Sequence, residues 1–162
     1  MLQADTLLVD ALKPDGKLLE RIAALDERLA KFRKILGNER VASVLSLKDV
    51  ARMLDFALEA FVDFANGQAP TNLRGVSFEV PALSQADIGT ITKTLDLRPQ
   101  FEQKKEPLMT VLDTVSSLKP GDALMVEAPF HPMPLRRLLG GWGYRSYATQ
   151  LSPEHWQVVF KR

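Results

Sequence analysis

The sequence of 162 residues contains no cysteine. This absence excludes disulfide bonds, thiolate metal sites, cysteine nucleophiles and the carriage of sulfur as a cysteine persulfide. Histidine is scarce as well, since the chain has only His131 and His155. A conventional zinc or two-metal site built on so few imidazoles needs many additional carboxylate ligands. Thiol chemistry is therefore excluded, and metal chemistry is disfavoured.

An excess of one charge and long apolar runs are also missing. The 21 lysine and arginine residues nearly balance the 20 aspartate and glutamate residues, whereas nucleic-acid-binding domains usually carry a basic excess. No apolar stretch approaches the ~18 residues of a membrane span. The first residues, MLQADTLLVDALKPDG, lack the basic region of a signal peptide. We therefore expect a cytoplasmic protein that contacts neither nucleic acid nor a membrane.

The first 67 residues show the periodicity of helices. Apolar residues recur at spacings of three and four over residues 18–36 and again over residues 54–65, which places them on one face of a helix. The segment Ser46-Leu47-Lys48-Asp49 has the pattern of a helix N-terminus with a capping box. We predict a helical domain over residues 1–67.

Within the second of these stretches, Phe56, Ala60 and Phe64 form another apolar line, four residues apart and outside the main stripe. One interpretation is a helix that is buried on two sides within a small bundle. The other is an interaction surface for a partner chain, which includes a homodimer formed through the helical domain. The sequence leaves both interpretations open.

Residues 68–90 follow neither the helical nor the strand period and contain Pro70, Gly75, Pro81 and Gly89. A connection of this length is long for the interior of one compact domain. We therefore predict a linker over residues 68–90 that joins two domains.

Beyond the linker the pattern alternates between strands and helices. We predict strands at residues 91–97, 123–128, 144–150 and 156–160, and helices at residues 107–118 and 132–139. The order βαβαββ favours parallel pairing of the first two strands, with both helices on one face of the sheet. The chain is therefore predicted to be α+β, with a two-layer α/β sandwich over residues 91–162.

The ends of the first two predicted strands bring polar residues to one edge of the sheet. Two helices are predicted to start there, near Pro107 and Pro132, and helix N-termini attract anions. The residues near that edge are Asp96, Arg98, Lys104, Lys105, Glu106 and His131. They form a candidate site for a small anion or a partner's carboxylate. In the alternative interpretation Glu106 and His131 cap helices, Asp96 and Arg98 fix a turn, and the lysines are solvated.

Recognisable catalytic motifs are absent. The sequence contains no GxSxG, HExxH, Walker or GxGxxG pattern and no evident pair of nucleophile and base. His131 is the candidate ligand for a haem or a metal, but Met133, two residues on, cannot bind the same iron from the opposite face. The sequence assigns no catalytic residue, no metal site and no defined cofactor.

The run LDLRPQFEQKKEPLMTVLDTVSSLKPGDALMVEAPF resembles the TusA/SirA-like domain. In that family an LDxRG-type strand end leads to a Cys-Pro-Glu-Pro helix start, and an LKPGD turn precedes the second strand. Glu106 and Pro107 match the last two positions of the helix start, while Lys104 stands where the family has its carrier cysteine.

The next segment is similar to a cysteine-less branch, an uncharacterised bacterial family, on the residues His131, Pro132, Pro134 and Leu135. Residues 29–67 resemble a second uncharacterised helical family that is often fused ahead of such domains. This resemblance implies a TusA-like fold over residues 91–162. It does not imply sulfur transfer, because Lys104 cannot form a persulfide.

These observations lead us to expect a non-catalytic binding or adaptor protein that contacts a partner protein or a small anion. The alternative is an accessory protein for redox, haem, metal or sulfur-linked metabolism that binds a small anion or cofactor near His131. An enzyme that uses His131 as an acid or base is the third possibility, and the sequence shows no partner residue for it.

Overall fold

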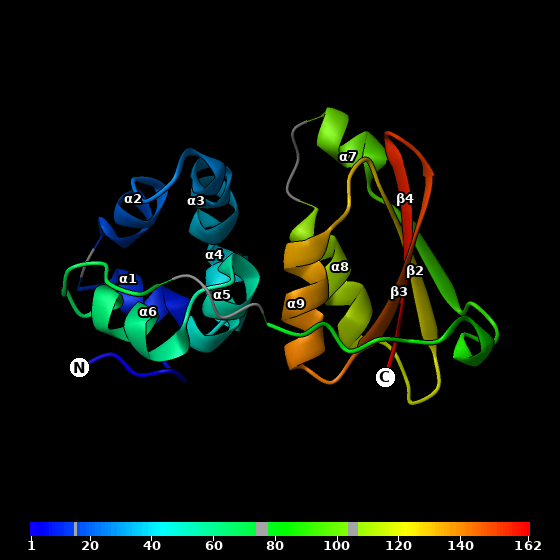
Figure 1. The fold of residues 1–162 in the computed structure, drawn as a ribbon, viewed down its shortest axis with the longest axis horizontal. Helices are drawn as coiled ribbons and strands as arrows, with labels where there is room; N and C mark the ends of the chain where they lie inside the picture. Colours follow the sequence, from blue (N-terminus) through cyan, green and yellow to red (C-terminus); the bar gives the residue numbers. More distant parts are fainter. Residues whose placement is uncertain (15, 74–77, 104–106) are drawn as a thin grey trace. The chain divides into compact units, whose positions relative to one another are not determined.

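The computed structural model describes residues 1–14, 16–73, 78–103 and 107–162 (Figure 1). It divides the chain into two compact units, Met1–Phe78 and Glu79–Arg162. The first unit is helical and the second combines a four-stranded mixed sheet with helices. The predicted α+β class is therefore confirmed. Among the described residues, no helix has both the length and the apolar character that a membrane span requires.

The first unit is built from short helices. They are α1 (Leu8–Leu12), α2 (Leu18–Ala23), the 3-10 helix η1 (Glu27–Leu29), α3 (Ala30–Gly37), α4 (Glu39–Val44), α5 (Leu47–Leu54) and α6 (Leu58–Ala65). The predicted capping box is present, because the Ser46 side chain accepts from the Asp49 N–H while the Asp49 carboxylate accepts from the Ser46 N–H. This box fixes the start of α5.

The capping box at Ser46 and the apolar spacing over residues 54–65 predict one continuous helix, but the structure has two helices there, α5 and α6. Asp55 ends α5 in the left-handed conformation, with φ at 61°. Its carboxylate accepts a hydrogen bond from the N–H of Phe78, which lies 23 residues further along the chain. The apolar spacing continues across the break, so periodicity alone does not reveal it.

The line formed by Phe56, Ala60 and Phe64 is not an exposed surface. Phe56 is fully buried and contacts the ring of Phe61, with ring centroids 5.7 Å apart. Phe64 is 3% exposed and lies under the guanidinium of Arg21. Ala60 is partly buried. Both phenylalanines are core residues of the helical unit, and Phe56 lies in the break between α5 and α6 and not on a helix. An interaction surface at these residues stays a prediction.

The second unit follows the predicted order of strands and helices. Its elements are η2 (Gln85–Asp87), β1 (Lys93–Asp96), α7 (Arg98–Glu102), α8 (Leu108–Ser116), β2 (Ala123–Ala128), α9 (Met133–Gly141), β3 (Arg145–Ser152) and β4 (His155–Lys161). The strand order in the sheet is β1-β2-β4-β3. As predicted, β1 and β2 are parallel, whereas β4 is antiparallel to both of its neighbours.

Helices α8 and α9 lie on the same side of this sheet (Figure 1). Successive side chains of a strand point to opposite faces, and the face under the helices takes Leu124 and Val126 from β2 and Phe160 from β4, all fully buried. Burial of these apolar side chains is the main contribution to the stability of the unit.

The other face of the sheet is partly covered by the chain's own residues 79–92, which we call the strap. Leu83 of the strap is 2% exposed and packs in a cluster with Ala123 and Val159. Ala82 forms a bridge with Ser146 of the edge strand β3. Part of the predicted linker is thus packed against the second unit. The limits of our predicted domains, at residues 67 and 91, stay a prediction.

Candidate functional site

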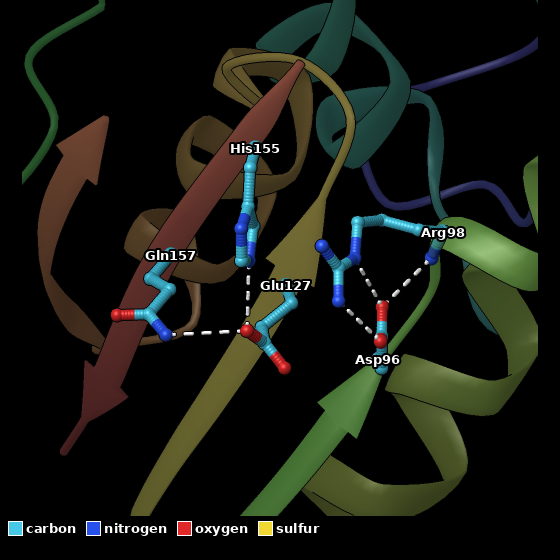
Figure 2. A network of polar contacts seen from close by, with 5 residues as sticks. All are labelled: Asp96, Arg98, Glu127, His155 and Gln157. Atoms are coloured by element: carbon cyan, nitrogen blue, oxygen red, sulfur yellow. Dashed lines mark hydrogen bonds and ion pairs between the residues drawn. The ribbon is translucent and has the colours of Figure 1, made fainter. Parts of the chain in front are cut away.

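The uncovered part of the strap-bearing face carries a row of polar side chains (Figure 2). Asp96 of β1 lies opposite Glu127 of β2, and Glu127 lies opposite Gln157 of β4. Residues that are directly opposite share a face of the sheet, so all three side chains point away from α8 and α9. His155 shares this face because it is two residues from Gln157. Together with Arg98, which follows β1, these residues form what we call the polar network.

Glu127 is the central carboxylate of the polar network. Its Oε1 accepts hydrogen bonds from Nε2 of His155 at 2.8 Å and from Nε2 of Gln157 at 3.2 Å. Its side chain is 17% exposed. The hydrogen bonds from Gln157 and His155 lower the pKa of Glu127 below its ordinary value, because they favour the charged form more than partial burial disfavours it. Glu127 is therefore an anion at neutral pH.

Asp96 and Arg98 form the second pair. The Arg98 guanidinium donates through Nε to Oδ1 at 2.9 Å and through Nη2 to Oδ2 at 2.8 Å, and the Arg98 N–H donates to Oδ1 as well. The hydrogen bond from Arg98 lowers the pKa of Asp96, and the same bond raises the pKa of Arg98. This pair fixes the turn from β1 into α7, in agreement with one of the two roles that the sequence left open.

The two pairs act on each other across the strands. The charge of Asp96 raises the pKa of Glu127, while the charge of Arg98 lowers it. The guanidinium thus offsets the repulsion between two neighbouring carboxylates. The polar network is a preformed arrangement of fixed charges, which suits recognition of a polar ligand by hydrogen bonds.

His131 lies on the other face of the sheet. Its ring stacks on Trp156, with centroids 4.4 Å apart and planes 7° apart. Trp156 shares a face with Phe160, which is buried under the helices. In addition, Nη1 of Arg136 in α9 lies 2.8 Å from Nε2 of His131, and Nε of Arg136 donates to Oγ of Ser146. His131 is therefore part of the packing between α9 and the sheet.

These contacts determine the hydrogen-bonding state of His131. Arginine has donors and no acceptor, so Nε2 of His131 must accept and the ring must be neutral, with its proton on Nδ1. Burial, together with the charge of Arg136, lowers the pKa of His131. Nε2 is already occupied by a protein hydrogen bond, which leaves it unable to bind a metal or a haem iron in this conformation.

The structure does not bring together all the residues of the site that the sequence predicts. Asp96 and Arg98 belong to the polar network, whereas His131 lies on the opposite face. Lys104, Lys105 and Glu106 lie outside the residues that the structure describes. The two helices that were expected to start at a common edge are α8 and α9. Both begin near the end of the sheet where the parallel strands β1 and β2 terminate, although α7 lies between β1 and α8 along the chain (Figure 1).

Sequence reasoning missed Glu127, His155 and Gln157. A signal was present, since Glu127 interrupts the apolar run ALMVEA and Gln157 interrupts the apolar stretch of the last strand. A polar residue within a buried strand marks a place where one face is uncovered. No group of three or more potential metal ligands of the His, Cys, Asp and Glu types is found within the described ranges.

Comparison with known proteins gives one result for this chain. Residues 94–162 match the model of a family described as "Uncharacterized conserved protein (DUF2249)". The match includes all five residues of the polar network and excludes the helical unit. No curated protein matches the chain, and no solved structure does.

Proposed function

We propose that the second unit is a non-catalytic binding module and that the polar network is its contact surface for a partner protein. The chain then acts as an adaptor, because a partner bound by this module is linked through the chain to the helical unit. The observation that carries the proposal is the pairing of Asp96 with Arg98 and of Glu127 with His155 on a sheet face that the helices leave open.

The charges of the network support recognition in preference to proton transfer. A general acid at neutral pH needs a pKa that is raised toward 7. Hydrogen bonds lower the pKa of both Asp96 and Glu127, so neither carboxyl holds a proton to give. His131, the acid–base candidate from the sequence, is engaged with Arg136 and Trp156. These features favour a binding protein over an enzyme.

A TusA-like fold without the carrier thiol is part of the same proposal. It is supported by the order of strands and helices in the second unit and by the sequence resemblance. Because the chain has no cysteine, persulfide carriage is not part of the function. The observed role of His131 gives no support to the alternative of a small anion or cofactor bound beside it.

The proposal is tested by quantitative affinity capture with four versions of the full chain as bait. The baits are the wild type, Glu127→Gln, Arg98→Ala and the control Arg28→Ala. We expect a protein that is retained from an extract of the native cells by the wild type and the control, and that the two network variants retain at least tenfold less well.

Arg28 provides a matched control because it repeats the geometry of Arg98. Its side chain and its N–H bind the carboxylate of Asp26, two residues earlier, just as Arg98 binds Asp96. That pair lies in the helical unit. Retention of the same proteins by all four baits, or of none by the wild type, overturns the proposal. Circular dichroism of each variant checks that the fold is intact.

A further inference from the structure

Several polar atoms of the network have no hydrogen-bond partner among the residues that the structure describes, among them one oxygen of Glu127 and one nitrogen of Arg98. Glu127 uses Oε1 for both of its hydrogen bonds, which leaves Oε2 as an open acceptor. Arg98 uses Nε and Nη2 for Asp96, which leaves Nη1 as an open donor. Figure 2 shows Nη1 of Arg98 on the side of the guanidinium that faces Glu127 and His155.

The surrounding charges disfavour a charged ligand of either sign. An anion that approaches Arg98 also meets the carboxylates of Asp96 and Glu127, and a cation that approaches Glu127 meets the guanidinium of Arg98. Like charges brought together at an interface reduce affinity and act against the wrong partner. A neutral group that both donates and accepts hydrogen bonds satisfies the two open atoms without this repulsion.

A carboxamide is a neutral side-chain group that carries the two functions on separate atoms, an NH₂ donor and a carbonyl acceptor, whereas a hydroxyl offers both on one oxygen. The Glu127 side chain is 17% exposed, so most of it is buried. The tip of a side chain reaches such a position more readily than a peptide backbone, which brings two flanking residues with it.

We propose that the polar network binds the side-chain carboxamide of an asparagine or glutamine of the partner protein. Oε2 of Glu127 accepts from the amide nitrogen, and Nη1 of Arg98 donates to the amide oxygen. This inference rests on the proposed binding function and specifies the chemistry of the contact. It makes Glu127 and Arg98 the residues that determine specificity.

Nuclear magnetic resonance titration of the isotope-labelled full chain tests the proposal with four small probes. Acetamide represents the side-chain amide, N-methylacetamide the peptide backbone, acetate an anion and methylammonium a cation. The readouts are the Nε–H of Arg98 and the NH₂ of Gln157, the neighbour that shares Oε1 of Glu127. We expect acetamide to shift both signals saturably, by at least threefold more than any other probe at equal concentration.

Variants make the assignment specific. Arg98→Lys removes the Nη1 donor and Glu127→Gln replaces the carboxylate, so each is expected to reduce the acetamide-induced shift of the Gln157 signal at least threefold. Arg28→Ala is expected to leave it unchanged. An equal or larger response to N-methylacetamide, acetate or methylammonium overturns the carboxamide assignment, as does the absence of any response.

The result is distinguishable from failure of the proposed function. If affinity capture depends on the network but a different probe gives the largest shift, the binding module stands and the carboxamide is wrong. If acetamide binds as expected but no protein is captured through the network, the network recognises a carboxamide, and the proposed adaptor function is wrong.

Discussion

The two faces of the four-stranded sheet use the same residue types for opposite purposes. Under the helices, the His131 ring stacks on Trp156, and Arg136 binds both His131 and Ser146, which holds α9 against the strands. On the other face, His155, Arg98 and two carboxylates pair at partly exposed positions. A histidine and an arginine therefore serve packing where a helix covers them, and remain partly exposed where none does.

The face of the sheet that α8 and α9 do not cover has two parts. Strap residues 79–92 cover the half that contains Ala123 and Val159 with apolar side chains, and the polar network occupies the remainder. The position of the network on the sheet is thus set by where the strap ends. Substitutions in the strap, at the packing of α9 and in the polar network should lower the free energy of unfolding by successively smaller amounts.

The largest effect is expected from Leu83→Ala, which removes the buried anchor of the strap. Truncation of a buried leucine leaves a cavity and typically costs about 2–5 kcal/mol of stability. Urea denaturation followed by circular dichroism measures the loss. The same reasoning predicts that a chain starting at residue 94, where the family match begins, is less stable than one starting at residue 79. Equal stability of the two would show that the strap is dispensable.

A smaller loss is expected from Gly140→Ala, at the contact between α9 and the strap. A Cβ at this position lies 2.7 Å from Cδ of Pro81, whose ring cannot rotate away. Overpacking costs about 1–3 kcal/mol, which exceeds the roughly 1 kcal/mol that alanine gains over glycine in a helix. Thermal denaturation should therefore show a lower Tm. Gly37→Ala is the matched control, because its nearest neighbour lies at the ordinary distance of 3.5 Å.

Titratable groups on the two faces of the sheet should also change the stability of the protein in different pH ranges. The pKa of His131 is lowered in the folded protein from 6.5, so the unfolded chain takes up this proton first and stability falls as the pH drops below about 6.5. The pKa of Glu127 is lowered from 4.5, and its contribution is lost only as the pH falls below that value.

Urea denaturation at a series of pH values measures this difference. His131→Gln, which keeps an acceptor for Arg136, should remove the pH dependence that begins near 6.5 and leave the more acidic one. Glu127→Gln should weaken the dependence below pH 4.5, to which the lowered pKa of Asp96 also contributes, and leave the dependence that begins near 6.5. An unchanged profile in His131→Gln would contradict the neutral, buried state of that ring.

The smallest effect on stability is expected from Arg98→Ala. Both side chains of the Asp96–Arg98 pair are more than a third exposed, and such pairs contribute less than about 1 kcal/mol. A loss of partner binding in this variant, together with a change in the free energy of unfolding below that value, would separate recognition from folding. A larger destabilisation would instead make the pair a structural feature.

Much of the second unit was predictable from local patterns, since β2 has the predicted bounds and the helices α8 and α9 lie within two residues of the predicted ranges. The helical unit was less predictable, because Asp55 breaks a helix whose apolar spacing continues without change. The hydrogen bond that accompanies this break comes from Phe78, and local periodicity contains no information about so distant a contact.

For the candidate site, local sequence located Asp96, Arg98 and His131 near the same edge of the sheet. It did not place them on different faces, nor did it bring Glu127 together with His155, 28 residues away. Whether a polar side chain is buried or partly exposed depends on what covers it, and here that is decided by α9 on one face and by the strap on the other.

The amino-acid sequence by itself determined that this chain has no thiol chemistry and that strands and helices alternate in its second half. Composition and periodicity are properties of neighbouring residues, so they needed no coordinates. The tertiary structure alone decided which face each polar residue occupies, because face is a relation between strands that are distant along the chain.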